Sequence, residues 1–307
     1  MFSMLCIGDN VVDINYDRKK IYPGGNCVNV SVYVRSLGYD AAYVGVLADD
    51  AYAKLVRDVL DSHHIDRSLC PIKHGETGRC SCKTINGDRI LTDENDLGLV
   101  KSSPLLISDA ILRFARDFSL IHTSCYSFID GQLEKLKGLG IPLIYDFSDL
   151  WDEKKIAAVC PNCTYALFSV GNLDNFNQNK QLLKQVVDKF NCELSIATLG
   201  ADGAWVYYHD KEFFLFPYNR SGKVFDTTGC GDAWISGFIA TYQCERDKYR
   251  SYTTAGTSDF HLSDDDENDF SNGLIPYCMH VGNYCAAKIA KTDGALGYFV
   301  PFADWEE

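Results

Sequence analysis

The sequence predicts a doubly wound α/β fold, in which a mostly parallel sheet is covered by helices on both faces. Short apolar runs, typical of buried strands, alternate along the chain with longer helical segments. Glycine-rich turns stand directly before two of those helices, and folds of this class bind ligands at such turns. The chain has 307 residues, 46% of them hydrophobic, which fits one large α/β domain or two small ones. We assign residues 1–307 to a single domain.

Individual elements follow from the spacing of apolar residues. The predicted buried strands are residues 5–7, 42–46, 120–122, 143–145 and 194–197. The segment after Asn26 repeats apolar residues at three- and four-residue spacing, and residues 52–60 carry their leucines and valines on one face, so both are predicted helices. Ligands collect at the carboxyl ends of parallel strands, where we expect Asp13, Asp146 and Thr198.

Two regions depart from this alternation. Residues 13–22 and 78–91 alternate as antiparallel strands do, and Asn86-Gly87 is a strong hairpin signal; a plain surface hairpin is the alternative for these segments. Residues 246–272 contain an acidic run at 263–269. This run lacks the glycine and the terminal glutamate of a calcium loop of the EF-hand type, so we expect a solvated, mobile surface insertion.

Composition limits the function. The formal charge of −13 argues against nucleic acid or an anionic membrane as a partner, but a local anion site can still bind ATP. No apolar run reaches the ~18 residues of a membrane span, and the N-terminus has no signal-peptide pattern. The 13 cysteines stand mostly in apolar segments, which predicts reduced, buried thiols in a cytoplasmic protein rather than a metal site or redox pair.

The segment Asp226-Thr227-Thr228-Gly229-Cys230-Gly231-Asp232 precedes an apolar, helical run. The first N–H groups of a helix have no partner within it, and the helix dipole makes that end electropositive. Glycines let an anion approach the bare backbone. A carboxylate beside a phosphate site is repelled unless it takes a proton from an attacking hydroxyl, so Asp232 indicates phosphoryl transfer to an alcohol. The alternative is that Asp232 merely caps the helix.

A second turn, Gly24-Gly25-Asn26-Cys27-Val28-Asn29, opens another helix near the N-terminus. Its polar groups are neutral amides, which suit sugar hydroxyls better than phosphate. The two turns, far apart and in this order, resemble the two signatures of the ribokinase-like (PfkB) carbohydrate kinases. The resemblance covers nearly the whole chain and includes residues 8–13, 44–50, 198–204, 283–287 and 293–295. Residues 8–14 and 145–152 most resemble the fructoselysine 6-kinase branch of that family.

The resemblance implies site residues by position. Asp232 is the expected general base, and Gly229, Cys230 and Gly231 form the expected anion hole. The expected sugar-binding residues are Asp9, Asn10, Asp13, Gly24, Gly25, Asn26, Asn29 and Asp149. The expected nucleotide-binding residues are Thr198, Gly200, Gly203, Asp226 and Asn283. Asp9 is also interpretable as a strand-end cap, and Asp226 either supports a monovalent-cation loop or caps its own turn. Residues 13–22 and 78–91 would form a small β lid over the sugar, and also the contact of a homodimer.

Three positions depart from the family pattern. Cys230 replaces a common alanine, with little expected effect because the backbone N–H binds the anion. The family's Asn-x-x-Glu motif, which organises Mg²⁺, aligns with Asn172-Leu173-Asp174-Asn175, so Asn172 and Asp174 remain as the expected metal residues. Asp149 stands where many members have arginine, which inverts the local charge.

The predicted function is an ATP- and Mg²⁺-dependent phosphotransferase acting on a primary hydroxyl of a ketose-type sugar. The leading substrate is fructoselysine or a related fructosamine, phosphorylated at its 6-hydroxyl. One alternative is a kinase for another sugar or a nucleoside. A different class of protein, a catalytically weak relative that only binds sugar, is favoured by Asn175 alone, whereas the intact Asp232 and glycine turn favour an enzyme.

Overall fold

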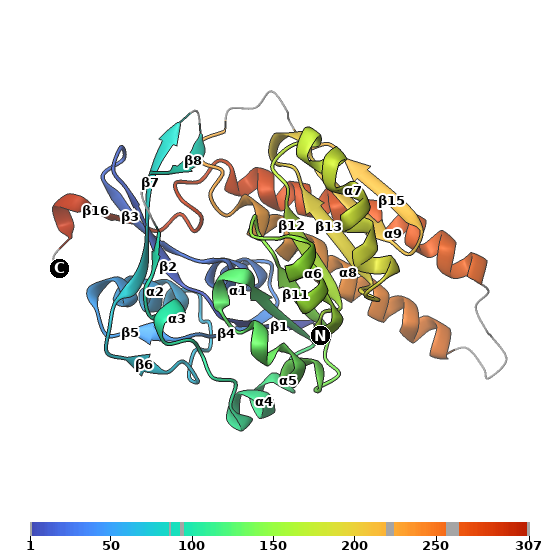
Figure 1. Cartoon of the computed structure of the whole chain (residues 1–307), viewed down its shortest axis with the longest axis horizontal. Coiled ribbons are helices and arrows are strands. Elements are labelled where there is room, and N and C mark those ends of the chain that lie inside the picture. Colours follow the sequence, from blue (N-terminus) through green and yellow to red (C-terminus); the bar gives the residue numbers. More distant parts are fainter. Residues whose placement is uncertain (1, 86, 93–94, 219–223, 256–263, 306–307) are drawn as a thin grey trace.

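A computed structural model describes residues 2–85, 87–92, 95–218, 224–255 and 264–305. Its main sheet has eight strands within these residues, and neighbouring strands pair in parallel except at one edge, where the last two pairings are antiparallel (Figure 1). In spatial order these are β15 (Lys211–Leu215), β14 (Ala204–Tyr208), β13 (Leu194–Thr198), β12 (Tyr165–Ser169), β11 (Leu143–Asp146), β10 (Leu120–Ser124), β1 (Ser3–Ile7) and β4 (Asp40–Val44). The predicted fold class is therefore confirmed.

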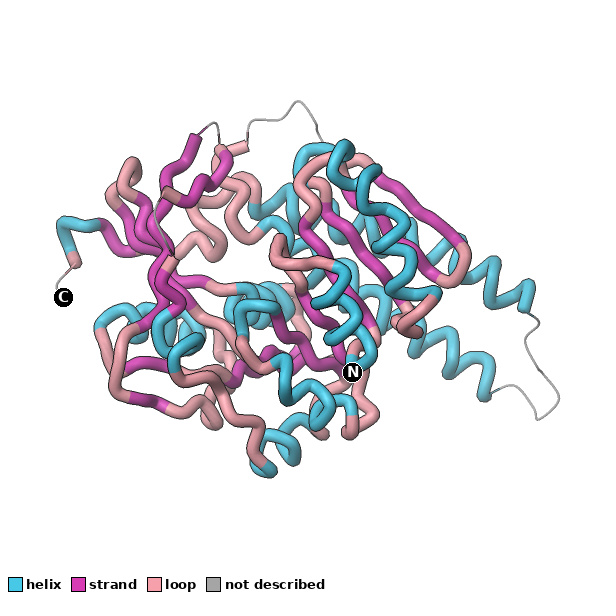
Figure 2. Tube along the Cα trace, viewed as in Figure 1, coloured by secondary structure: helices cyan, strands magenta, loops and turns pink. Residues whose placement is uncertain are grey.

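Both faces of this sheet are buried, because alternate residues of each strand enter different apolar cores. In β1, Met4 and Cys6 pack into one core and Leu5 and Ile7 into the other. The first core is closed by α1 (Asn26–Ser36), α2 (Ala51–Ser62), α8 (Cys230–Ala255) and α9 (Asp264–Ile289). The second is closed by α4 (Asp109–Ala115), α5 (Leu133–Lys137), α6 (Glu153–Val159) and α7 (Leu173–Asp188). Figure 2 shows helices on both sides of the strands. A strand buried on both faces needs a continuous apolar run, which is why the sequence signals these strands well.

A second sheet lies beside the first. Its strands are β16 (Val300–Pro301), β3 (Lys20–Gly24), β2 (Val11–Asn15), β7 (Thr77–Ile85) and β8 (Asp88–Leu91), and β9 (Asp96–Leu97) pairs with β7. The predicted hairpins exist: β2 pairs antiparallel with β3, and β7 with β8. The two hairpins are joined by parallel pairing of β2 with β7, which the alternation did not indicate. Ile85 pairs with Asp88, and Gly87 between them has φ of 91°. Asn86 lies outside the described residues.

Two expectations at strand ends need correction. The strand predicted at 42–46 spans Asp40–Val44, and beyond it the carbonyl of Val46 accepts a hydrogen bond from the side chain of Asn10. Asp13 does not follow a strand of the main sheet. It lies in the middle of β2, in the second sheet. The remaining short elements are β5 (Leu47–Ala48), which pairs with β6 (Ile72–Lys73), and α3 (Gly98–Ser102).

The helices α8 and α9 run side by side and extend past the main sheet in Figure 1. They take up most of the segment predicted as an acidic surface insertion at 246–272, because α8 continues to Ala255 and α9 begins at Asp264. Residues 256–263 lie outside the described residues, as do the side chains of the acidic run that follows. Among the helices that the structure describes, none is both long enough and apolar enough to cross a membrane.

Candidate active site

The amino end of α1 is shaped by a glycine that brings two segments into contact. Gly25 is the N-cap of α1 and has φ of 111°. A Cβ there would lie 2.8 Å from Asp9 Oδ2 and 2.9 Å from Asn10 Cα, so only glycine fits. Gly25 has no side chain to cap the helix, and Asp9 supplies the acceptor instead: the backbone N–H of Cys27 donates to Asp9 Oδ1 at 3.4 Å.

Two asparagines in the first turns of α1 reach carboxylates from distant parts of the chain. Asn26 Nδ2 donates to Asp146 Oδ2 at 2.9 Å, and Asn29 Nδ2 donates to Asp232 Oδ2 at 2.8 Å. Asp146 ends β11, and Asp232 lies in the first turn of α8. The two glycine turns of the sequence therefore meet at one site, with an amide of one bonded to the carboxylate of the other.

The electrostatics of this site keep a carboxylate basic. Asp232 is buried, and burial raises its pKa well above the ordinary value; the charge of Asp146 raises it further. The hydrogen bond from Asn29 and the charge of Arg89 oppose this rise. Burial also raises the pKa of Asp146 to about 6, against hydrogen bonds from Ser148 N–H and Asn26. A carboxylate with a raised pKa is a stronger proton acceptor, as general-base catalysis near neutral pH requires.

The turn before α8 is held by Asp226, and Asp232 lies inside the first turn of the helix that follows. Asp226 Oδ1 accepts a hydrogen bond from the N–H of Thr228 at 2.9 Å, so Asp226 caps this turn. Gly229 has φ of 77°, and a Cβ there would lie 2.5 Å from the hydroxyl of Tyr33. A Cβ on Gly231 would meet no atom within 4 Å, so an anion can reach the backbone there.

Asp13 and Arg89 bring the second sheet to the site. Arg89 Nη1 donates to Asp13 Oδ2 at 2.7 Å. Burial raises the pKa of Asp13, against the charge of Arg89. Asp13 Oδ1 and Asn29 Oδ1 are buried and have no hydrogen-bond partner within the described part of the chain. Because buried polar atoms are ordinarily bonded, these two acceptors fit the hydroxyl groups of a bound sugar.

The other expected sugar-binding residues are fixed within the protein. Asp9 Oδ1 also accepts a hydrogen bond from Ser124 Oγ at 2.7 Å. Asn10 Nδ2 donates to the hydroxyl of Tyr43 at 2.9 Å and to the carbonyl of Val46. Gly24 ends β3 opposite Val11. Asp9 thus caps the start of α1 and not the end of a strand, and a contact of these residues with sugar stays a prediction.

Asp149 is exposed, and its Oδ1 accepts a hydrogen bond from the Tyr126 hydroxyl at 2.7 Å. Asp149 does not cap the helix that follows it, because the N-cap of α6 is Asp152, whose carboxylate accepts from Lys155 N–H at 2.7 Å. Asp149 contributes to the charge around Asp146. It therefore lies close enough to the site to influence a ligand there.

The expected nucleotide residues follow β13. Thr198 ends that strand, Gly200 opens a short 3-10 turn, and Gly203 has φ of 120° where a Cβ would lie 2.3 Å from the carbonyl of Leu215. Asn283 of α9 is buried, and both ends of its amide are used: Oδ1 accepts from Trp234 Nε1 and Nδ2 donates to the carbonyl of Phe216. Its role toward a nucleotide stays a prediction.

The expected metal residues stand at the start of α7, next to the nucleotide segment. Asp202 Oδ2 accepts from Leu173 N–H at 3.1 Å, which joins the two segments. Asn172 is the N-cap of α7, Asp174 is exposed, and Asn175 Nδ2 donates to the carbonyl of Val170. The described residues hold no group of three or more histidine, cysteine or acidic side chains that could bind a metal without other ligands.

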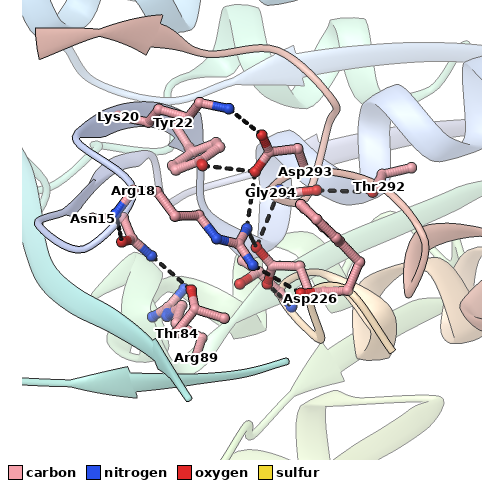
Figure 3. Close-up of polar contacts among 12 residues, drawn as sticks. Asn15, Arg18, Lys20, Tyr22, Thr84, Arg89, Asp226, Thr292, Asp293 and Gly294 are labelled. Carbon is pink, nitrogen blue, oxygen red and sulfur yellow. Dashed lines mark hydrogen bonds and ion pairs between the residues drawn. The ribbon is translucent and has the colours of Figure 1, made fainter. Parts of the chain in front are cut away.

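The reasoning from sequence missed the contribution of several charged residues. Arg89 stands two positions after the Asn86-Gly87 turn, and nothing local marks its pairing with Asp13, 76 residues away. Arg18 and Asp293 are further examples, and both approach the turn before α8 (Figure 3). Asp146 was expected at a ligand-binding strand end, but its pairing with Asn26, 120 residues away, leaves no local signal.

Comparison with known proteins adds an independent line of evidence. The family described as pfkB family carbohydrate kinase matches residues 6–255. The chain is 28% identical over 302 residues to fructosamine kinase FrlD of Bacillus subtilis (strain 168), covering 98% of this chain and 95% of that protein. It is 27% identical over 295 residues to fructoselysine 6-kinase of Escherichia coli (strain K12), covering 96% and 100%. The structure of Arabidopsis thaliana ribokinase complexed with ribose and ATP superposes with a TM-score of 0.72 at 17% identity, covering 96% of this chain and 94% of that one.

Proposed function

Because this chain belongs to the pfkB family of carbohydrate kinases, we propose that it transfers the γ-phosphate of ATP to the 6-hydroxyl of a fructosamine such as fructoselysine. The enzyme class is that of phosphotransferases with an alcohol group as acceptor. Similarity over nearly the full length to fructosamine kinase FrlD and fructoselysine 6-kinase supports the fructosamine substrate.

The observation that carries the proposal is that the site combines unpaired buried oxygen acceptors with several carboxylates. Asp13 Oδ1 and Asn29 Oδ1 are buried acceptors without partners in the described structure, so they suit the hydroxyl groups of a sugar. Asp146, Asp149 and Asp232 make the same region acidic. A fructosamine carries a protonated amine, which such carboxylates attract, whereas an unmodified ketose gains nothing from this charge.

The proposed chemistry uses Asp232 and the turn before it. Asp232 accepts the proton of the 6-hydroxyl, the hydroxyl oxygen attacks the γ-phosphorus, and the bond from that phosphorus to the bridging oxygen breaks to release ADP. The N–H groups at the start of α8, around Gly229, Cys230 and Gly231, hold the charge of the transferring phosphoryl group. Thr198, Gly200 and Gly203 are proposed to hold the nucleotide.

Magnesium is expected as a partner of ATP. The donors at the start of α7 are few, since Asn172 Oδ1 already accepts from the N–H of Asn175 and only Asp174 offers a carboxylate. This set fits an ion that keeps several waters and is bound mainly through phosphates. We assign Asp174, with Asn172, to this role; the ion would neutralise phosphate charge.

Two features of the molecule support further assignments. Ile85 and Ile90 of the second sheet are 51% and 44% exposed, which supports a homodimer through that sheet. Sedimentation of an Ile85→Glu, Ile90→Glu variant as a dimer would contradict this assignment.

All thirteen cysteines are free, which supports the cytoplasm as the compartment.

The test is a kinase assay that measures ADP release with fructoselysine, fructose, ribose and a nucleoside, using Asp232→Asn as the inactive control. The expected result is the highest kcat/KM with fructoselysine. Preference for a nucleoside or an ordinary sugar would replace the fructosamine assignment, and no release with any sugar would favour a protein that only binds it. The similarity of 25% to an aminoimidazole riboside kinase is the reason to include the nucleoside.

A further inference from the structure

Arg18 lies where two carboxylates meet the phosphate-binding turn (Figure 3). It stands in the connection between β2 and β3, where its N–H donates to Asn15 Oδ1 at 3.0 Å. Its Nη1 donates to Asp226 Oδ2 at 2.5 Å and to Asp293 Oδ1 at 2.9 Å. Its Nη2 donates to the carbonyl of Phe225 at 2.8 Å. One planar guanidinium thus binds three oxygens from two distant segments, a geometry that suits arginine and not lysine.

The carboxylates that Arg18 joins belong to segments that shape the turn before α8. Asp226 begins that turn. Asp293 precedes Gly294 and Ala295, and Ala295 lies against Gly229, since a Cβ on Gly229 would be 2.7 Å from Ala295 Cβ. Arg18 therefore helps to fix the backbone N–H groups that would hold the phosphoryl group.

Asp293 is held by further donors from the same hairpin. The hydroxyl of Tyr22 donates to its Oδ1 at 2.7 Å, and Lys20 forms an ion pair with its Oδ2. Burial alone would raise the pKa of Asp293, but the hydrogen bonds from Lys20 and Tyr22 outweigh it and lower that pKa. The carboxylate stays ionised, and its charge is balanced by cations of the protein.

A monovalent cation at Asp226, which the family resemblance implied, does not fit this arrangement. Such an ion needs carboxylate or carbonyl oxygens as ligands. Here Asp226 Oδ1 accepts from Thr228 N–H, and Oδ2 accepts from Arg18 and from Gly294 N–H at 3.2 Å. The neighbouring carbonyl of Phe225 also accepts from Arg18. An inorganic cation would compete with these donors and would be repelled by the guanidinium.

We propose that Arg18 is a built-in cation that orders the phosphate-binding turn, so that this enzyme works without an added monovalent cation. Arg18 is a positioning residue, because it acts through Asp226 and not on the reacting atoms. The side chains of Arg18 and Asp226 are 16% and 4% exposed, so the pair is shielded from water and is fixed by the fold. Of the two measurements that test this proposal, only the reaction rate depends on the proposed kinase activity, and the melting temperature does not.

The experiment compares wild type, Arg18→Ala and Arg18→Lys in KCl and in choline chloride at equal ionic strength. Arg35→Ala is the matched control, because it removes a half-buried arginine from a pair with Asp40 at the far end of α1. Melting temperature and sugar-dependent ADP release are both measured. Wild type should give the same values in both salts. Arg18→Ala should lose kcat by about 10²-fold through misplacement of the turn, with a smaller change in KM for sugar.

The distinguishing result is rescue. In Arg18→Ala, K⁺ or millimolar guanidinium should restore part of kcat and raise the melting temperature, and Arg18→Lys should fall between wild type and alanine. Stimulation of wild type by K⁺ would overturn the proposal. A loss in Arg18→Ala that neither cation reduces would also overturn it, because Arg18 would then be only structural. If wild type phosphorylates no sugar, the proposed function fails, and the melting measurements still decide the role of Arg18.

Discussion

Replacing Asp232 with asparagine separates the general-base role proposed for its carboxylate from the cost of burying its charge. The substitution keeps the shape of the side chain and an oxygen that can accept the hydrogen bond from Asn29. It removes the negative charge and the ability to take a proton. The fold and sugar binding should therefore survive, while phosphoryl transfer should not.

The expected loss of activity follows from the role of a general base. Removal of such a group costs about 10²–10⁴ in rate, or ~2.7–5.5 kcal/mol of barrier. The pH dependence follows from the raised pKa of Asp232, which burial and the charge of Asp146 produce. In the wild type, kcat/KM should rise with pH as Asp232 loses its proton through this raised pKa.

The stability of the folded wild type should fall as pH rises, whereas its activity should increase. The folded state holds the Asp232 proton more tightly than the unfolded chain, so the stability that this group contributes is present below the unfolded pKa and is lost as pH rises through the folded pKa. Each unit of raised pKa corresponds to ~1.4 kcal/mol lost by the ionised wild type. At pH 8 the Asp232→Asn variant lacks this cost, so its melting temperature should exceed that of the wild type by about 2 °C or more.

The assay measures initial rates and melting curves from pH 5 to pH 9 for both proteins. Asp210→Asn is the control, because Asp210 is exposed in the turn between β14 and β15; it should match the wild type in both measurements. A kcat of Asp232→Asn within a factor of a few of wild type would refute the base assignment. A lower melting temperature at pH 8 would refute the reasoning on burial.

Three further predictions test neighbouring parts of the site. Gly229→Ala should lower the melting temperature, because the new Cβ would collide with Tyr33 and the residue has a positive φ. Gly231→Ala should keep the wild-type melting temperature, because its Cβ would meet no atom within 4 Å, but it should lower kcat. Equal losses of melting temperature in the two variants would contradict this prediction. Asp149→Arg should lower kcat/KM for fructoselysine about fivefold, as expected for an exposed pair worth ~1 kcal/mol, and leave fructose unaffected; parallel kinetics on the two sugars check it. Asp174→Ala should raise the Mg²⁺ concentration at half-maximal rate, and an unchanged midpoint would show that this acid is merely surface.

The sequence predicts the main sheet because its strands are buried on both faces. Such strands leave apolar runs that are visible without any partner, as at residues 5–7 and 194–197. Three strands of the main sheet were not among those predicted. β12 and β14 were missed although they are apolar and buried, and β15 lies at the antiparallel edge, where its residues alternate between half-buried and exposed. The parallel pairing of β2 with β7 leaves no local signal either, since register between distant strands depends on the tertiary fold.

The glycine turns could also be predicted from the sequence, since the local backbone shape requires glycine at Gly25 and Gly229. The partners of the site carboxylates could not be predicted. Arg18 and Asp226 are 208 residues apart in sequence, and Arg89 and Asp13 are 76 apart. An arginine in a polar hairpin is ordinarily a solvated surface residue, and only the packing of the second sheet against the main one turns it into an ion-pair partner.

The second sheet contributes to the site because it supplies the cations that pair with two buried carboxylates. Asp13 and Asp226 are buried carboxylates, and an unpaired buried charge is costly. Both find their cations on the hairpins of that sheet: Arg89 on β8 serves Asp13, and Arg18 before β3 serves Asp226. Movement of the β2–β3 hairpin away from α8 would separate Arg18 from Asp226, whereas Asp13 and Arg89 both belong to the second sheet and would move together. The second sheet is therefore attached to the turn before α8 by the ion pairs of Arg18, and a ligand that moves this hairpin away must compensate the charge of Asp226.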